Sequence, residues 1–179
     1  MNICVFGAAS DLIDDKYKEA AFALGKAGHT LIFGAGGEGM MGAVARGFHA
    51  GNGFVVGIVP EFFKDQDYEA LYRKNDELIY TKDIAERINL MEERSDAFIA
   101  VPGGIGTYEE FFKIFVSKGL RVHDKPLVLF NVDGFFDELV DMIHSGIEKK
   151  FIAAANLEKF RIYDAGEMDE LIKYLNTGG

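Results

Sequence analysis

Short apolar runs alternate with longer amphipathic stretches along this chain, and the alternation restricts its fold more than any other feature. The pattern predicts strands at residues 3–6, 30–33, 54–59, 77–80, 97–101, 127–131 and 161–163. It predicts helices at residues 15–27, 39–50, 83–94, 107–118, 135–149 and 168–175. Apolar strands separated by helices are typical of a parallel sheet that is covered on both faces. The sequence therefore predicts an α/β fold, a single-domain Rossmann-like doubly wound parallel sheet with helices on both faces, over residues 1–179. Residues 61–76 are predicted to form a loop or short lid.

Size and charge narrow the range of partners. The chain has 179 residues, enough for one domain with a substantial core, and a formal net charge of -10. This charge argues against nucleic acid and anionic membranes as partners. Cys4 is the single cysteine, which excludes an intramolecular disulfide and a cysteine metal cluster. No apolar run reaches the ~18 residues of a membrane span and no signal peptide is visible, so we expect a cytoplasmic protein.

A glycine-rich turn follows the apolar run 97–101 and leads into a predicted helix; it reads Pro102-Gly103-Gly104-Ile105-Gly106-Thr107-Tyr108-Glu109-Glu110. Such a turn presents backbone N–H groups at the positive end of a helix dipole, where a phosphate binds well. Thr107 and Glu110 also have the spacing of a capping box, in which Glu110 would only reach back to the Thr107 N–H. The alternative is functional: near a helix N-terminus Glu110 stays ionised, which suits a nucleophile or a stabiliser of positive charge.

The first glycine-rich turn of the chain spans residues 34–42 and follows the second predicted strand. Gly34, Gly36 and Gly39 have the G-x-G-x-x-G spacing of dinucleotide-binding turns, and Glu61 follows about twenty residues later. The turn does not follow the first strand, however, as it does in a dinucleotide fold. Close helix–strand packing and a mononucleotide site shared with the second glycine turn, residues 102–110, are the other interpretations. Both turns are predicted at the carboxyl ends of strands, where ligands bind in such folds.

Several segments, in order, resemble the LOG ("lonely guy") family of cytokinin riboside 5'-monophosphate phosphoribohydrolases, often labelled "possible lysine decarboxylase". Residues 102–110 match its P-G-G-x-G-T-x-x-E signature, and residues 34–42 resemble its G-G-G-x-x-G-L-M-G turn. Residues 57–60 resemble its G-V-I-P segment, and residues 123–126 and 131–136 resemble the segment after the signature helix. The similarity extends over nearly the whole chain.

The resemblance implies a function. Family members hydrolyse the N-glycosidic bond of a nucleoside 5'-monophosphate to free base and ribose 5-phosphate, without a metal or other cofactor, and form homodimers with the active site near the interface. The family's catalytic arginine falls on Arg87 when aligned without gaps from the signature, and its catalytic glutamate falls on Glu110. The predicted substrate- and phosphate-binding residues are Gly103, Gly104, Ile105, Gly106, Thr107, Tyr108, Glu109, Gly36, Gly37 and Ser10. We expect the scattered histidines to be structural: His29, His49, His123 and His144.

Some positions depart from the family pattern. Its lysine after the catalytic arginine is replaced by Ile88, and of its opening C-G-S-S only the last serine remains, as Ser10. Arg121 is a candidate for a replacement charge. These changes leave open a carrier or sensor that binds a nucleotide without turnover. A nicotinamide-dependent oxidoreductase is a third hypothesis. A literal lysine decarboxylase is the weakest, because no lysine marks a site for pyridoxal phosphate.

Overall fold

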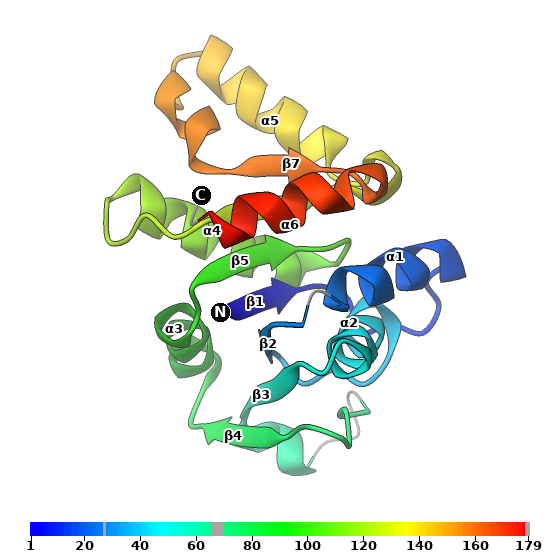
Figure 1. Cartoon of the computed structure of the whole chain (residues 1–179). Coiled ribbons are helices and arrows are strands. Elements are labelled where there is room, and N and C mark those ends of the chain that lie inside the picture. Colours follow the sequence, from blue (N-terminus) through cyan, green and yellow to red (C-terminus); the bar gives the residue numbers. More distant parts are fainter. Residues whose placement is uncertain (27, 66–69, 178–179) are drawn as a thin grey trace.

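The computed structural model describes residues 1–26, 28–65 and 70–177, which form a seven-stranded sheet flanked by helices (Figure 1). The strands are β1 (Asn2–Phe6), β2 (Thr30–Phe33), β3 (Phe54–Pro60), β4 (Glu77–Thr81), β5 (Ala97–Ala100), β6 (Leu127–Phe130) and β7 (Arg161–Tyr163). The α-helices are α1 (Asp15–Gly25), α2 (Gly39–Ala50), α3 (Ile84–Arg94), α4 (Ile105–Gly119), α5 (Asp137–Glu148) and α6 (Met168–Asn176). Short 3-10 helices are η1 (Glu61–Asp65), η2 (Val132–Gly134), η3 (Ala154–Lys159) and η4 (Ala165–Glu167). The predicted α/β class is confirmed.

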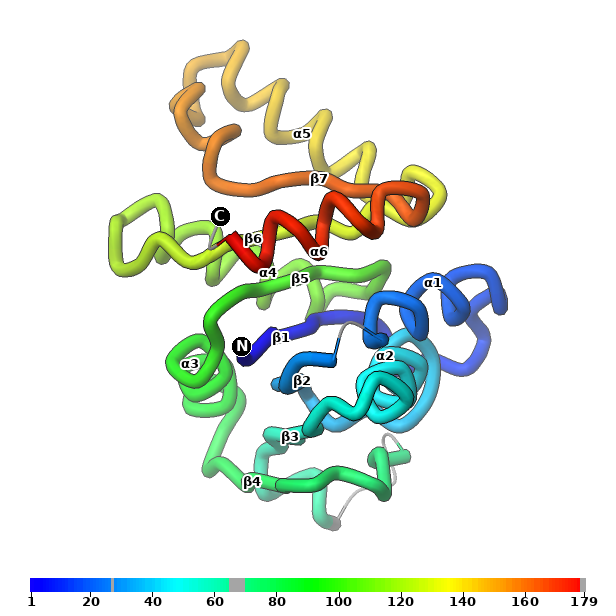
Figure 2. Tube along the Cα trace, viewed as in Figure 1, coloured from blue at the N-terminus to red at the C-terminus, as the bar shows by residue number. Residues whose placement is uncertain are grey.

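The strand order is β4-β3-β2-β1-β5-β6-β7, and all neighbouring strands are parallel. Figure 2 shows how the chain starts at β1, builds the sheet outward to β4, returns to β5 beside β1 and then builds outward to β7. The chain therefore reverses its direction of travel between β1 and β5, and a doubly wound fold binds its ligand beyond the carboxyl ends of the strands at this switch point. Phe6 pairs with Ala100 there, so the segments that follow the two strands lie together.

Each face of the sheet has its own apolar core, because alternate residues of a strand point to opposite faces. Ile3 and Val5 of β1 pack in the core that contains residues of α1, α2 and α6. Cys4 and Phe6 pack in the core that contains residues of α3, α4 and α5. The central strands β1, β2, β3, β5 and β6 are largely buried on both faces, which explains why their sequences are almost continuously apolar, whereas the edge strands β4 and β7 are partly exposed.

Close packing of α1 against α2 explains the small residues of α2. A Cβ atom on Gly25 would meet the backbone nitrogen of Phe48, and one on Gly47 would meet the carbonyl oxygen of Phe22. Glycine at both positions lets the two helix backbones approach directly.

Two predicted elements differ from the structure. Helix α4 begins at Ile105 with Gly104 as its N-cap, so Thr107 lies inside the first turn and the capping-box interpretation of Thr107 and Glu110 is wrong. Part of the predicted loop 61–76 is η1, and residues 70–72 pair with the turn at 34–37: Leu71 forms a bridge with Gly36, and the Tyr72 N–H donates to the Ala35 carbonyl. Residues 66–69, and the predicted last helical residue, 27, lie outside the described residues.

Within the described residues, none of the helices is both long and apolar enough to span a membrane.

Candidate active site

A cavity of about 340 Å³ lies beyond the carboxyl ends of β1 and β5. Its volume falls within the range of ~300–1,000 Å³ that is common for small-molecule sites. Its walls come from residues 5–10, from Gly34 and Gly36 of the first glycine turn, and from the N-terminal part of α4. The position agrees with the ligand site that the switch point of the fold predicts.

An arginine–glutamate pair lies in this cavity. Arg87 Nη2 is 3.0 Å from Glu110 Oε1, and the two side chains are 20% and 8% exposed. Arg87 Nε also donates a hydrogen bond to the carbonyl oxygen of Ile58 at 3.2 Å. Asp83 caps α3 by accepting a hydrogen bond from the Glu86 N–H at 2.8 Å, so the helix starts at Ile84 and Arg87 lies near its start. The fold thus brings together the two residues predicted to be catalytic.

The first glycine turn is shaped by this arginine and by backbone packing. A Cβ atom on Gly34 would meet Nη2 of Arg87, so glycine makes room for the guanidinium. Gly36 lines the cavity. Gly37 instead packs against residues 70–72, and its N–H donates to the Ala70 carbonyl at 2.7 Å. Gly39 has a φ of +54° and lies against the backbone of residues 8–10. Gly34 and Gly39 therefore have structural causes that need no dinucleotide, and Gly36 lines the cavity.

The second glycine turn contains open space. An added Cβ atom on Gly104 or Gly106 would meet nothing within 4 Å, and Gly104 has an ordinary φ of -91°. The fold itself does not require glycine at these two positions, yet both line the cavity. Gly103 differs, because a Cβ atom there would meet Thr107 and the backbone of Ala8. The space beside Gly104 and Gly106 is consequently available to a ligand at the N-terminus of α4.

The remaining predicted site residues divide into two groups. Thr107 and Ser10 line the cavity with the catalytic pair. Ile105 is 84% exposed, Glu109 is exposed, and Tyr108 packs edge-on against Phe136 with ring centroids 6.2 Å apart. These three side chains, with Gly37 and Gly103, are not part of the cavity wall.

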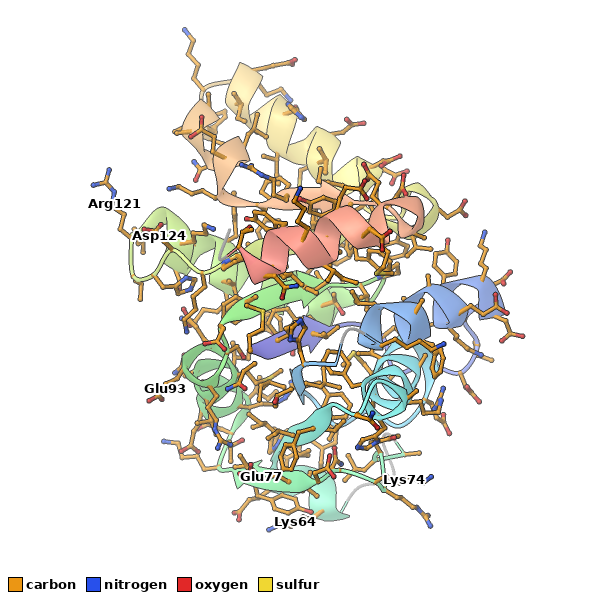
Figure 3. The ribbon with its side chains drawn as sticks, in the orientation of Figure 1. Lys64, Lys74, Glu77, Glu93, Arg121 and Asp124 are labelled. Carbon is orange, nitrogen blue, oxygen red and sulfur yellow. The ribbon has the colours of Figure 1, made fainter. Side chains whose placement is uncertain are left out.

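Ile88 and Arg121, which were noted where the sequence departs from the family pattern, both lie outside the cavity wall. Ile88, which replaces a lysine, is 6% exposed and belongs to the core. Arg121 follows the C-terminus of α4 and is exposed, and it projects from the loop there (Figure 3). A helix of 15 residues is ~22 Å long, and the cavity lies at its other end. Arg121 therefore does not supply a replacement charge to the cavity of its own chain.

An apolar wall of the cavity was not predicted. It is formed by Met41, Val59, Pro60, Phe63 and Leu71. Residues 57–60 were singled out only as a family motif, and Phe63 and Leu71 lie in the segment predicted to be a loop. Among the described lining residues, only Ser10, Arg87, Thr107 and Glu110 have polar side chains. The cavity therefore has a polar end at α4 and an apolar side that suits a ring system.

The described residues include no group of three or more histidine, cysteine, aspartate or glutamate side chains arranged to hold a metal ion. No lysine is found among the described residues that line the cavity. Pyridoxal phosphate chemistry needs a lysine for the Schiff base, so this cavity does not fit a lysine decarboxylase.

The fold and the cavity define a Rossmann-like α/β protein with a cavity at a helix N-terminus and an arginine–glutamate pair in its wall. Residues 41–175 match the family model described as "Possible lysine decarboxylase", and the chain belongs to this family, that of the LOG proteins. It is 35% identical over 177 residues to cytokinin riboside 5'-monophosphate phosphoribohydrolase LOG3 of Arabidopsis thaliana, which covers 97% of this chain and 80% of the relative. The corresponding LOG5 enzyme of the same plant is 34% identical, over 98% of this chain and 77% of its own length.

Solved structures show the same fold. The Moco carrier protein from Chlamydomonas reinhardtii superposes with a TM-score of 0.70 at 23% sequence identity, over 98% of this chain and 97% of that one. The family resemblance noted from the motifs is thus confirmed by whole-chain similarity, and the overall architecture by an independent structure.

Proposed function

We propose that this chain hydrolyses the N-glycosidic bond of a nucleoside 5'-monophosphate, AMP or a cytokinin riboside monophosphate, to free base and ribose 5-phosphate. The observation that carries the proposal is the Arg87–Glu110 pair, 3.0 Å apart inside the cavity and next to the N-terminus of α4. The names of the relatives support the reaction class. The proposed reaction requires no cofactor and no metal.

The chemistry follows from the charge that develops in the reaction. Cleavage of the glycosidic bond builds positive, oxocarbenium-like charge at C1' of the ribose. The Glu110 carboxylate would stabilise this charge or attack C1' directly, and a preorganised carboxylate in a site shielded from water does so most effectively. Arg87 would orient Glu110 with one end of its guanidinium, while its Nε stays bound to the Ile58 carbonyl. Its other N–H groups would contact the ribose hydroxyls or the phosphate.

The phosphate would bind at the start of α4, where the first N–H groups of the helix have no partner inside the helix. The open space beside Gly104 and Gly106 supports this placement. The base would lie against the apolar wall that contains Phe63 and Leu71. Anchoring both ends of the nucleotide would hold C1' near Glu110.

Gly106→Ala is expected to weaken substrate binding without weakening the fold. The added methyl group meets no protein atom but occupies the proposed phosphate space, so we expect KM to rise about tenfold, which corresponds to about 1.4 kcal/mol of binding energy. Because alanine is the better helix former, stability should stay equal or rise by about 0.5–1 kcal/mol. Steady-state kinetics and thermal unfolding measure both effects. An unchanged KM would contradict the phosphate placement.

Gly103→Ala is the matched control. Its methyl group would collide with Thr107 and with backbone at Ala8, so it should lower the unfolding temperature.

We also propose a homodimer. The solvent-facing side of α4 and the loop after it carry Ile105, Val116, Leu120 and Val122, which are 84%, 53%, 73% and 70% exposed. A row of exposed apolar side chains of this kind is typical of an association surface. Light scattering should give the mass of two chains, and Val116→Lys with Leu120→Lys should give the mass of one. A parent protein with the mass of one chain at micromolar concentration would refute the dimer.

We further propose that residues 1–179 act as one LOG-like nucleotide-binding domain and that the protein is cytoplasmic. The single sheet to which all seven strands belong supports one domain. The buried free thiol of Cys4 is in keeping with a reducing compartment.

The experiment that tests the proposed function is incubation with a panel of nucleoside 5'-monophosphates, followed by chromatography of base and ribose 5-phosphate. Release of base at enzyme-dependent rates would support the hydrolase. Tight binding of a nucleotide that survives unchanged would refute it in favour of a carrier or sensor. Binding of NAD or NADP in preference to any monophosphate would instead favour the oxidoreductase.

A further inference from the structure

A second set of charged side chains links α3 to α4 outside the cavity, and it centres on Glu92. Glu92 Oε2 lies 3.2 Å from Nζ of Lys113 on α4, and Oε1 lies 3.2 Å from Nε2 of His123 in the loop after α4. Ser117 of α4 is a hydrogen-bond partner of the same carboxylate. Lys125 Nζ donates to the backbone carbonyl of Glu92 at 2.7 Å. Groups from α4 and from the following loop thus converge on one residue of α3.

This cluster is largely shielded from water. The side chains of Glu92 and His123 are 12% and 10% exposed, whereas Lys113 is 42% exposed. Burial raises the pKa of Glu92, but the hydrogen bond with Ser117 and the Lys113 ammonium outweigh it, so the pKa lies below its usual value. Glu92 is therefore a mostly buried carboxylate that stays ionised, and such a group is stable only while its partners remain in place.

His123 completes the cluster in its neutral form. Burial lowers its pKa below the usual value, although the Glu92 carboxylate opposes the shift. The ring stacks on Phe98 with centroids 5.7 Å apart, and Nδ1 accepts a hydrogen bond from the Lys125 N–H at 3.3 Å. The hydrogen of the neutral ring is then on Nε2, which faces Glu92 Oε1.

The two helices joined by Glu92 are those that carry the proposed catalytic pair. Glu92 follows Arg87 by five positions on α3, and Lys113 follows Glu110 by three on α4, which are ~7.5 Å and ~4.5 Å along the helix axes. The two ion pairs have opposite polarity: the cation is on α3 in the first pair and on α4 in the second. Sliding α4 so that Lys113 approached Arg87 would bring like charges together. The arrangement therefore favours one register of the two helices.

We propose that Glu92 is a positioning residue: through Lys113, Ser117 and His123 it sets the register of α3 against α4 and thereby keeps Arg87 in contact with Glu110. The inference rests on the proposed function, because its effect is read in the hydrolysis of a nucleoside monophosphate. Glu92 itself lies outside the cavity wall, so we expect it to have no contact with a bound substrate.

The test compares Glu92→Gln with Glu93→Gln. Glutamine keeps the size of Glu92 and a hydrogen-bond acceptor for Ser117 but removes the charge that holds Lys113. Glu93 is the exposed neighbour on the same helix and points away from the protein (Figure 3), so its variant controls for a lost charge. We expect Glu92→Gln to lower kcat for AMP about tenfold with KM within about twofold, because a small misplacement of a catalytic group reduces the rate of the chemical step. Glu93→Gln should keep the kcat of the parent.

Lys113→Gln keeps the proposal falsifiable if Glu92→Gln folds poorly, since Lys113 is half-exposed and its replacement leaves the core intact. The double variant, Glu92→Gln with Lys113→Gln, tests whether the two residues act together. If Glu92 and Lys113 act through one contact, the double variant should lose no more kcat than Glu92→Gln alone. Where Glu92→Gln does not fold, a lowered kcat in Lys113→Gln with unchanged KM supports the proposal.

An unchanged kcat in Glu92→Gln or, where that variant does not fold, in Lys113→Gln overturns the positioning role. A loss of rate that matches only the loss of folded protein, fully additive losses, or an effect confined to KM overturn it as well. Absence of hydrolysis by the parent protein is a different result, because it refutes the proposed function itself.

Discussion

Glu110→Gln is expected to lower kcat for nucleoside monophosphate hydrolysis by about a thousandfold or more while the protein stays folded and binds AMP. Glutamine has the shape of glutamate and can still accept a hydrogen bond from Arg87. Without the negative charge it neither stabilises the oxocarbenium-like transition state nor forms a bond to C1'. The size of the effect follows from the loss of the one carboxylate among the described lining residues of the cavity.

Product chromatography, AMP calorimetry and thermal unfolding should be run together on this variant. Glu109→Gln is the matched control, since Glu109 is the exposed neighbour on α4 and should be replaceable without loss of rate. A Glu110→Gln protein that keeps more than about a tenth of the parent kcat would show that Glu110 is not the catalytic carboxylate, because the expected loss is far larger.

Arg87→Ala is expected to remove activity and to destabilise the fold by about 3 kcal/mol. The substitution leaves the nearly buried Glu110 carboxylate without its cation and the Ile58 carbonyl without its donor. Breaking a buried ion pair from one side costs about 3–5 kcal/mol, and the partial exposure of Arg87 places this case at the lower end. Urea unfolding measures the loss of stability, and the base-release assay measures the loss of activity.

Three further variants separate charge from geometry at this position. Arg87→Lys keeps the cation but loses the planar fork, so we expect a folded protein with kcat lowered about a hundredfold. Combining Arg87→Ala with Glu110→Gln should recover part of the lost stability, because the nearly buried negative charge that Arg87 had balanced is then absent. Arg94→Ala on the same helix removes a half-exposed pair with Glu77 and should cost less than about 1 kcal/mol. An Arg87→Lys protein with the parent kcat would refute the proposal that catalysis needs the planar guanidinium of Arg87.

Most of the elements could be predicted from the sequence because the central strands of the sheet are buried on both faces. A strand such as Leu127–Phe130 needs four consecutive apolar residues, and a helix such as Gly39–Ala50 needs an apolar stripe. Each hydrophobic pattern can therefore be recognised within a short segment of the sequence. The ends were less predictable. Helix α4 begins two residues earlier than expected, because Gly104 rather than Thr107 takes the extended conformation of the N-cap. The T-x-x-E spacing of side chains did not reveal at which residue the helix would begin.

The polar end of the candidate site could also be predicted from the sequence, whereas its apolar wall could not. Glu110 and the second glycine turn form a contiguous motif, and Arg87 was found through the family resemblance, by aligning the family's arginine with this chain from that motif. The apolar wall was missed because it combines Met41 of α2, the end of β3, Phe63 of η1 and Leu71. No short sequence pattern marks residues that lie far apart in the chain and come together only when the sheet forms. Leu71 in particular takes its place because residues 70–72 pair with the turn at 34–37.

By itself, the sequence determined the α/β alternation, the glycine turn at the start of α4 and the candidate catalytic glutamate in it, since each depends on residues close together in the chain. The candidate arginine came from the family resemblance. Only the tertiary structure decided which strands are neighbours, that Gly34 makes room for Arg87, and that Glu92 joins the helices that carry the proposed catalytic pair. These features depend on contacts between residues far apart in the chain. A carboxylate such as Glu92 has the same sequence signature on a solvated helix face as at a buried contact, and only the packing of α3 against α4 separates the two.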